Sequence, residues 1–434
     1  MLNRKIHKLV SILKQPFKRP FYGFVRGHSE LTEDQIAEVK SCLLKDDADI
    51  TLQFERKFAS LVGDGDCVSY ASGRMGFYAL MRLLNIGNGD EVILPGATCS
   101  VMVNSVLRVG ATPIFSDIDP NNFGSCPLGI EKCVSPRTKL MVAQHSFGIP
   151  CDIEAIKDLA HLHGIFLLED CALTLGSKSN GVVVGNYGDA ALFSTDHSKP
   201  LNTLIGGMIY SRNRDLVRKL LDEQLLYAHL SSKKQSALWR RVLIERFVCT
   251  PSRQGLMGLI DLASKVLHSM PSLESPFLTD DSCSTPGARY PYPAKLPSFL
   301  ALLGLMQANR WSEEAHLRKE TLRKLLKITA TSSIRSLVSP AYYNPHLDIV
   351  PLRFVWVANQ PDERNKFGNY IDISWTWFRE PIVATKEPLS NFGYRDGSCP
   401  VSEYVGSRII NVPCNVPSDH VSGLVKRFSE TINC

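Results

Sequence analysis

The 434-residue sequence contains no run of about 18 uncharged apolar residues, the length that a membrane-spanning helix needs. The N-terminal stretch is basic but has neither a continuous apolar core nor a small-residue cleavage site, so it does not resemble a secretory signal. The twelve cysteines include no C-x-x-C pair, and this spacing argues against both a disulfide framework and a zinc site. These absences predict a cytoplasmic protein with reduced thiols and no bound metal.

Positive charge is concentrated at the N-terminus. Residues 1–26 contain seven Lys or Arg and no acid, whereas the remainder of the chain has 42 basic and 43 acidic residues. No motif that reads nucleic acid accompanies this basic segment, so nucleic-acid binding is not predicted. We expect residues 1–30 to form a basic arm that is solvated or disordered.

Short apolar runs alternate with helix-period segments between about residues 53 and 212, a pattern typical of a parallel sheet covered by helices. We expect helices at 73–84 and 152–163, the second ending at Gly164 as a left-handed C-cap. The expected strands are residues 91–95, 112–118, 139–146, 165–170, 190–195 and 207–211. The sequence therefore predicts an α/β fold.

The pattern changes after about residue 226. Residues 226–290 combine a basic apolar segment, a second helix-like stretch and a tail rich in Ser and Pro that indicates a linker. A helix-period segment returns at 299–327, and the last hundred residues or so mix short strands with helices. We therefore expect a large domain at 31–225, an insertion and linker at 226–290, and a smaller α+β domain at 291–434.

Three short segments carry candidate chemistry. Residues 71–80 place a turn of small residues before a helix, where backbone N–H groups and the helix dipole can hold a phosphate. Residues 167–172 end an apolar strand in two acids, at the sheet edge where α/β folds bind ligands. Residues 192–211 place a single lysine, Lys199, between two strands. Taken singly, each has a commoner explanation: an ordinary helix turn, an N-cap acid and a surface lysine.

The order of the three segments fits one cofactor. Pyridoxal phosphate needs an anion site, a carboxylate on its pyridine nitrogen and a lysine that forms an imine with its aldehyde. Asp170 would keep the ring nitrogen protonated, and Lys199, partly desolvated at the sheet edge, would form the imine. Once displaced by a substrate amine, Lys199 would act as the general base.

At these residues the sequence resembles the sugar aminotransferases of the DegT/DnrJ/EryC1/StrS family, fold-type-I enzymes that use pyridoxal phosphate. The likeness is strongest over residues 53–211, and no gap is needed between Asp170 and Gly207. It implies a mostly parallel sheet with helices on both faces, and Lys199 and Asp170 as catalytic residues. The matching segments are residues 72–74, 89–95, 148–152, 169–172, 188–199 and 206–207. The cofactor contacts that it implies are Ser72, Gly73, Arg74, Cys99, Asp170, Ser194 and Lys199.

Several positions depart from the family pattern. Cys99 stands where the family usually stacks an aromatic residue on the cofactor, and a thiol offers much less stacking area. Arg74 replaces the usual Thr and would restore positive charge near the phosphate. Leu173 and Ile205 replace a Gln and a Glu. Pro293 and Lys295 occupy the Asn and Arg positions of a loop through which the family reaches the neighbouring subunit.

The resemblance implies amino transfer within a homodimer for polysaccharide or secondary-metabolite biosynthesis. The expected donor is glutamate, and the expected acceptor is the keto group of a nucleotide-linked sugar or related cyclic ketone. Two alternatives stay open: elimination or dehydration on such a sugar, and a regulatory protein that binds pyridoxal phosphate with little turnover. Retention of Lys199 argues against elimination or dehydration. The altered pocket positions leave the regulatory alternative open.

Two basic segments, KLVSILKQPFKR and SALWRRVLIERF, mix Lys or Arg with large apolar residues, as interfacial helices do. They are interpreted either as sites of weak peripheral membrane contact or as a loose tail and an ordinary helix packed on the body. His197, two residues before Lys199, either lines the pocket or faces solvent.

Overall fold

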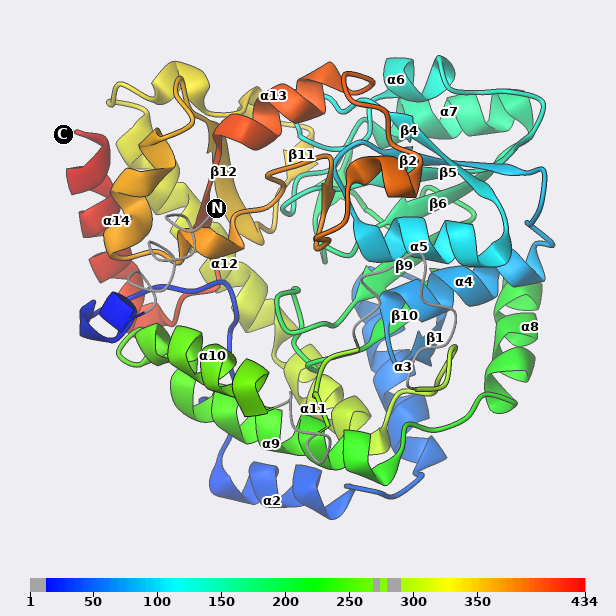
Figure 1. Cartoon of the computed structure of the whole chain (residues 1–434), viewed down its shortest axis with the longest axis horizontal. Helices are drawn as coiled ribbons and strands as arrows, with labels where there is room; N and C mark the ends of the chain where they lie inside the picture. Colours follow the sequence, from blue (N-terminus) through cyan, green and yellow to red (C-terminus); the bar gives the residue numbers. More distant parts are fainter. Residues whose placement is uncertain (1–12, 268–273, 279–289, 434) are drawn as a thin grey trace.

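A computed structural model describes residues 13–267, 274–278 and 290–433. Its centre is a seven-stranded sheet in the order β1-β10-β9-β6-β5-β2-β4 (Figure 1). The junctions from β9 to β4 are parallel, whereas β10 is antiparallel to both of its neighbours. The mostly parallel α/β sheet is therefore confirmed. Its strands are β1 (Asp66–Tyr70), β2 (Glu91–Pro95), β4 (Thr112–Ser116), β5 (Thr138–Gln144), β6 (Phe166–Asp170), β9 (Ala190–Ser194) and β10 (Gly207–Ser211).

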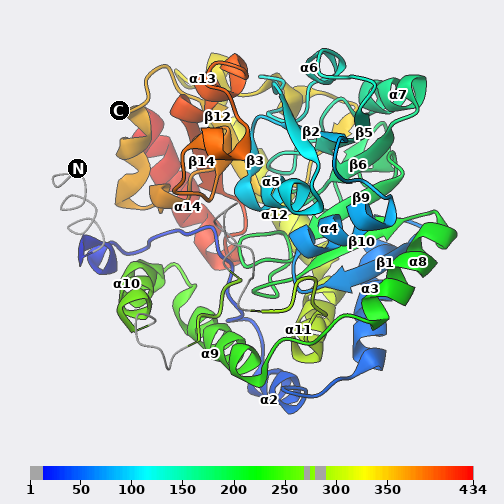
Figure 2. The same ribbon diagram turned by 45° about the vertical axis from the view of Figure 1, so that its right-hand side comes forward.

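Alternate side chains of the parallel strands enter two different cores, as a sheet buried on both faces requires. In β2, Val92 and Leu94 join one core while Ile93 joins the other. The helices α4 (Gly73–Leu83), α5 (Ser100–Val109) and α8 (Arg214–Leu225) contribute to the first core. On the other face lie α6 (Pro127–Glu131) and α7 (Ile153–His163), as Figure 2 shows, and α7 ends at Gly164 with φ 61°. Helices therefore cover both faces, as predicted.

Helix α11 (Ser298–Asn309) packs in the large domain, and this differs from the expected boundary at residue 291. It lies against α3 (Ala48–Val62), close enough that a Cβ on Gly304 would come within 2.4 Å of the Phe54 ring. Helix α2 (Glu33–Ser41) packs on the same side. The helix-period segment expected at 299–327 is divided at Arg310, where α12 (Trp311–Thr329) begins. Within α12, Trp311 joins the core of the large domain, whereas Leu322 and Leu325 join a separate core.

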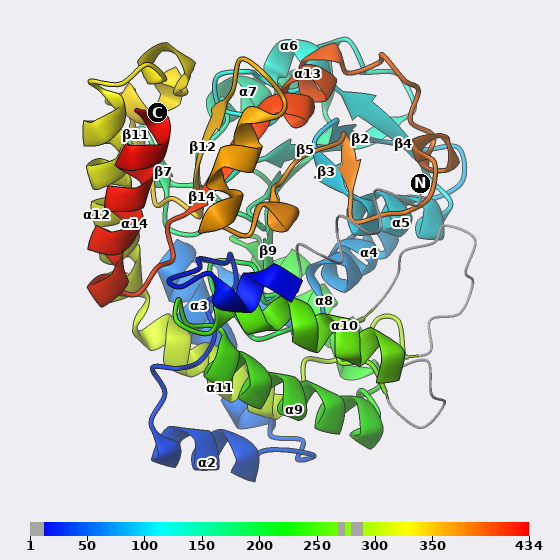
Figure 3. The same cartoon turned by 60° about the vertical axis from the view of Figure 1, so that its left-hand side comes forward.

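The second domain has the predicted α+β composition. Its strands β12 (Arg353–Val357) and β14 (Ile409–Pro413) pair antiparallel, and α12 and α14 (Ser418–Ile432) lie side by side (Figure 3). Phe354, Trp356 and Phe428 pack ring to ring between them. Helix α13 (Pro400–Arg408) precedes β14.

Short elements complete the described chain. The two-residue strands are β3 (Thr98–Cys99), β7 (Lys178–Ser179), β8 (Val182–Val183), β11 (Leu347–Asp348) and β13 (Ile382–Val383). The 3-10 helices are η1 (Gln15–Phe17), η2 (Gln254–Leu256), η3 (Arg335–Leu337), η4 (Pro340–Tyr343), η5 (Glu363–Asn369), η6 (Ile373–Trp375) and η7 (Leu389–Phe392).

The N-terminal arm differs from the expected loose tail over residues 21–28. Tyr22 and Phe24 are buried, and the Tyr22 N–H donates to the Tyr370 carbonyl at 2.7 Å. Side-chain amides from both domains bond this segment: Asn202 to the Arg26 carbonyl and Asn415 to the Phe24 carbonyl. The arm therefore links the two domains because its aromatic residues supply apolar area that a solvated tail would leave exposed. Residues 1–12 lie outside the described part of the chain.

The expected insertion contains two helices, α9 (Ser232–Val248) and α10 (Met257–Leu267). Ser231 caps the N-terminus of α9, and its side chain accepts the Lys234 N–H. Much of the Ser/Pro-rich tail lies outside the described residues. Among the helices of the described ranges, none is long and apolar enough to cross a membrane.

Candidate functional site

The predicted site residues come from three segments that meet at the carboxyl edge of the sheet. Strand β6 ends at Asp170, β9 ends at Ser194, and Ser72 at the start of α4 forms a bridge with Gly206 just before β10. Lys199 lies in the loop that joins β9 to β10. The topology therefore brings the predicted lysine, carboxylate and phosphate turn to one edge of the sheet, where ligands bind in α/β folds.

Lys199 lies in a tight turn, in which its backbone N–H donates to the Asp196 carbonyl at 2.9 Å. Its ammonium nitrogen lies 4.2 Å from the centre of the Trp377 ring. Burial lowers the pKa of Lys199, and the negative charges of Asp196 and Asp170 oppose that shift. A lysine with a lowered pKa is more often neutral at physiological pH, and the neutral amine is the form that attacks a carbonyl.

Asp170 is buried at the end of β6, with 5% of its surface exposed. One carboxylate oxygen accepts the Ala172 N–H at 2.9 Å. Burial raises the pKa of Asp170, whereas that hydrogen bond and the positive charge of Lys199 act in the opposite direction. A buried carboxylate of this kind binds a protonated ring nitrogen strongly because water does not compete for it.

His145, just after β5, and Glu169, next to Asp170 in β6, lie beside the carboxylate, and the backbone N–H of His145 donates to the Asp170 carbonyl at 3.0 Å. The Cys151 N–H donates to Nδ1 of His145, so Nε2 carries the proton and donates to Glu169 at 3.0 Å. Glu169 also accepts backbone N–H groups from residues 185, 187 and 188. Cys171 lies near both side chains, in a cluster whose potential ligand atoms are within 4.8 Å of one another. The hydrogen bonds named above give the His145 ring and the Glu169 carboxylate protein partners.

The phosphate turn is built by a close approach of two backbones. A Cβ on Gly207 would lie 2.3 Å from both Cα and N of Gly73, so β10 can pass the start of α4 only as glycine. The Ser72 hydroxyl precedes the helix, and its Oγ is buried with no hydrogen-bond partner in the described ranges. An unpartnered hydroxyl beside the N–H groups of a helix N-terminus fits an anion.

Arg74 and Cys99 lie near this turn but make other contacts. The Arg74 guanidinium donates to the carbonyl of Leu278 and, at 3.2 Å, to the hydroxyl of Tyr290. Cys99 precedes α5, and its strand β3 pairs with β13 of the later part of the chain. Burial raises the pKa of the Cys99 thiol, against the positive charges of Lys199 and Arg74. The thiol is therefore kept in its neutral form.

The departures from the family pattern are mostly buried. Leu173 belongs to the core of the second domain and Ile205 to that of the large domain. In the loop that contains Pro293, the Ala294 carbonyl accepts the Ala71 N–H at 2.9 Å. Nearby, Tyr292 lies 4.2 Å from the Arg108 guanidinium of α5. Within this chain the loop thus packs beside the phosphate turn.

His197 faces the inserted helix α9. Its Nδ1 lies 3.2 Å from Glu245, which also accepts hydrogen bonds from Arg241 and Asn202. Burial alone would raise the pKa of Glu245. The hydrogen bond from His197 and the positive charges of His197 and Arg241 instead lower that pKa to about 2. Burial acts to lower the pKa of His197, but the negative charges of Asp196 and Glu245 outweigh it, so that this pKa is raised. The insertion therefore clamps the loop that carries Lys199.

Sequence reasoning missed three residues of the second domain. Trp377 covers Lys199, Arg353 lies 5.2 Å from the centre of the same ring, and Asn411 accepts both the Trp377 N–H and a bond from Arg353. A signal was available for two of them. Arg353 and Asn411 are polar residues inside apolar strands, PLRFVWV and IINVP, and such residues need a partner or a function.

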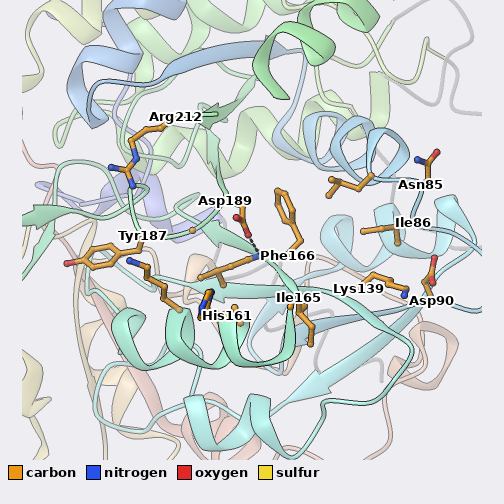
Figure 4. Close-up of a pocket in the computed structure, with 16 residues that line it drawn as sticks. Asn85, Ile86, Asp90, Lys139, His161, Ile165, Phe166, Tyr187, Asp189 and Arg212 are labelled. Carbon is orange, nitrogen blue, oxygen red and sulfur yellow. Dashed lines mark hydrogen bonds between the residues drawn. The ribbon is translucent and has the colours of Figure 1, made fainter. Parts of the chain in front are cut away.

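A pocket of 880 Å³ lies at the opposite edge of the sheet (Figure 4). Asp90, Lys139 and Phe166 mark the amino ends of β2, β5 and β6, and all three line it. Asp189 holds the rim by accepting the Leu167 N–H at 2.8 Å. This pocket is therefore separate from the site around Lys199.

Residues 30–250 match the model of the DegT/DnrJ/EryC1/StrS aminotransferase family. The chain belongs to this family. It is 38% identical over 202 residues to the UDP-N-acetyl-3-dehydro-alpha-D-glucosamine 3-aminotransferase of Acidithiobacillus ferrooxidans, covering 45% of this chain and 54% of that protein. It is also 38% identical over 189 residues to the spore coat polysaccharide biosynthesis protein SpsC of Bacillus subtilis, covering 44% of this chain and 47% of that protein. The chain thus spans about half the length of these relatives.

Solved structures of aminotransferases share the whole fold of this family member. The aminotransferase from Psychrobacter cryohalolentis superposes with a TM-score of 0.69 at 21% identity, over 92% of this chain and 96% of that one. TlmJ from Streptoalloteichus hindustanus gives a TM-score of 0.68 at 22% identity, over 95% and 97%. The similarity in sequence is concentrated in the large domain, whereas the similarity in fold includes the second domain.

Proposed function

We propose that this protein is a pyridoxal-phosphate-dependent aminotransferase. It would move an amino group from glutamate to the keto group of a nucleotide-linked sugar or a similar cyclic ketone. The observation that carries the proposal is the meeting of Lys199, Asp170 and the Ser72 turn at one edge of the sheet in a member of this family. Spr1654 of Streptococcus pneumoniae, a protein of the same fold, has been solved in PLP and PMP forms.

The residues present suit the cofactor. Ser72, Gly73 and the start of α4, with Ser194 at the end of β9, would hold the phosphate, and the unpartnered Ser72 Oγ supports this assignment. Asp170 would pair with the ring nitrogen. Bound to Lys199, pyridoxal phosphate would supply an electron sink for the carbanion left when the substrate loses a proton.

The chain's own residues would bind, orient and move a proton. Because its pKa is lowered, Lys199 is suited to accept and release a proton at Nζ near neutral pH. Trp377 covers that nitrogen and limits access of water. His145 and Glu169 would fix the direction of Asp170 through the bonds between β5 and β6.

The names of relatives support the substrate class. Besides the glucosamine enzyme, they include the GDP-perosamine synthase of Vibrio cholerae and the L-glutamine:2-deoxy-scyllo-inosose aminotransferase of Streptomyces fradiae. Keto groups on nucleotide sugars or cyclitols are thus the acceptors to test, with glutamate and glutamine as donors. We propose a cytoplasmic role in polysaccharide or secondary-metabolite biosynthesis.

Turnover assays test the proposal. The purified chain, loaded with pyridoxal phosphate, is expected to convert glutamate to 2-oxoglutarate only when a keto sugar is supplied, and Lys199→Ala should abolish this. Release of water or ammonia from the sugar without a change in glutamate would select elimination. Cofactor binding with no turnover across a panel of keto-sugar nucleotides would select the regulatory alternative. Both outcomes would contradict aminotransfer.

Assembly and membrane contact are separate proposals. We infer a homodimer, supported by the apolar surface that Leu225 and Leu226 expose beside α8, and light scattering of the purified chain would test it. For weak peripheral membrane contact, α9 offers an exposed stripe of Arg240, Leu243 and Phe247, although it buries most of its other apolar side chains. Absence of flotation with anionic liposomes at both low and high salt would exclude that contact.

A further inference from the structure

Arg353 is a buried cation that has no carboxylate partner in the part of the chain that the structure describes. Its side chain is fully enclosed at the start of β12, with 1% of its surface exposed. The guanidinium lies between two aromatic rings, 4.1 Å from the centre of Phe24 and 5.2 Å from that of Trp377. Within the described ranges no acid forms an ion pair with it. Burying an unpaired charge costs free energy, and an anion bound beside the guanidinium would offset that cost.

Two hydrogen-bond donors around Arg353 are unused. One nitrogen, Nη1, donates to the Trp375 carbonyl at 2.6 Å and to Oδ1 of Asn411 at 2.9 Å. The other, Nη2, is buried with no hydrogen-bond partner among the described residues, and so is Nδ2 of Asn411. Asn411 is itself only 2% exposed. Arg353 thus offers an unused N–H on a cationic group, and Asn411 offers one on a neutral amide. Two such neighbouring donors match the two oxygens of a carboxylate.

This pair lies beside the proposed reaction centre. The same Trp377 ring that Arg353 contacts lies 4.2 Å from Nζ of Lys199. Burial has the largest effect on the pKa of Lys199, followed by the nearby acidic groups. The positive charge of Arg353 also acts on that pKa and lowers it, so the two cations share one electrostatic environment. Burial also lowers the pKa of Arg353, to about 9, and a bound anion would reverse that shift.

We propose that Arg353 and Asn411 form a subsite that binds a carboxylate of the substrate. The inference rests on the proposed function and specifies one of its substrates, because an amino donor such as glutamate brings a carboxylate next to its reacting amine. The carboxylate belongs either to that donor or to an acidic sugar acceptor. Phe24 and Trp377 enclose the guanidinium and strengthen its bond to the anion by excluding water.

Succinate is the binding probe, because it has two carboxylates and no reacting amine. Calorimetric titration of the full chain, with and without pyridoxal phosphate, is expected to show binding that weakens at least about 30-fold in Arg353→Met. Asn411→Leu should weaken it less. Unchanged binding in Arg353→Met, or no succinate binding to the wild-type chain, would overturn the subsite. Because this titration needs no turnover, it separates failure of the subsite from failure of the proposed aminotransfer.

Stability distinguishes a ligand residue from a structural one. Arg353→Met should unfold at an equal or higher urea concentration than the wild type, since it removes an unsatisfied buried charge. Arg318→Met is the matched control: Arg318 is equally buried but bonded to Glu314 and the Pro200 carbonyl, so its loss should destabilise the fold. A loss of stability in Arg353→Met as large as that in the control would overturn the proposal.

The source of the carboxylate follows from half-reactions. If it is the donor, Arg353→Met should slow the reaction with glutamate while an amino sugar without a carboxylate reacts at the wild-type rate. If it is the acceptor, glutamate should react normally and only acidic keto sugars should be disfavoured. Either pattern supports the subsite, and equal slowing of every substrate would contradict it.

Discussion

The ammonium nitrogen of Lys199 lies 4.2 Å from the centre of the Trp377 ring, and the two residues come from different parts of the fold. Lys199 follows β9 of the large domain, whereas Trp377 precedes α13 of the second domain. The ring face attracts a cation, which partly offsets the effect of burial on the lysine. Together with the negative charges of Asp196 and Asp170, the ring therefore opposes the effect of burial on the pKa of Lys199.

Replacing Trp377 should change the pKa of Lys199. Trp377→Leu keeps the site apolar but removes the ring, so the charged form loses roughly 1 kcal/mol of stabilisation and the pKa of Lys199 should fall further. Trp377→Phe should give a smaller decrease. The pH dependence of the rate at which pyridoxal phosphate forms its visible imine with the chain measures this. An unchanged or higher apparent pKa in Trp377→Leu would refute the assignment.

The cluster of Glu245 and His197 should make stability depend on pH. The pKa of Glu245 is lowered from 4.5 to about 2, so its stabilisation is present above pH 4.5 and is lost as the pH falls towards 2. The pKa of His197 is raised above 6.5, so its stabilisation is present below pH 6.5 and is lost as the pH rises through the raised value. The cluster as a whole should stabilise most between these limits.

Glu245→Gln tests that dependence. Breaking this buried cluster should lower the free energy of unfolding by roughly 3–5 kcal/mol, most strongly between about pH 4.5 and 6.5. Urea denaturation at pH 3.5, 5.5 and 8.5 would measure it. Glu38→Gln, on the exposed face of α2, serves as the control and should change little at any pH. A difference between wild type and Glu245→Gln that is the same at all three pH values would argue against the clamp.

Gly207→Ala should disrupt the phosphate turn. The added methyl group would meet the Gly73 backbone at 2.3 Å, and neither strand nor helix can yield without breaking the adjacent bonds. We expect a loss of stability of about 3 kcal/mol or more together with loss of cofactor affinity. Gly87→Ala is the control, because its nearest contact would be an ordinary 3.4 Å from the Val109 carbonyl. Equal stability of the two variants would contradict this account of the turn.

Much of the large domain is predictable because its strands are continuous apolar runs between clear turn residues. All six expected strands are present, and the helix ending at Gly164 ends there. The strand of the central sheet that was missed, β1, has the sequence DCVSY, and the backbone N–H and the hydroxyl of its Ser69 both donate to the distant Glu55. The division at Arg310 and the placement of α11 were also missed, since both depend on packing against α3.

The meeting of the candidate site residues was predictable to the extent that each lies at a position readable from the local sequence. Ser72, Asp170 and Lys199 follow strand ends or begin a helix, and parallel topology alone brings such positions together. Trp377 and Asn411 reach the site from more than 170 residues further along the chain, and only tertiary structure places them there. The role of His197 was likewise hidden because its partner Glu245 lies in the inserted helix.

Covalent labelling of Lys199 tests the central claim most directly. The full chain is mixed with pyridoxal phosphate, reduced with sodium borohydride, digested and mapped by mass spectrometry. The account predicts one modified residue, Lys199, and no modified peptide in Lys199→Ala. Modification of a different lysine, or of none in the wild-type chain, would contradict it.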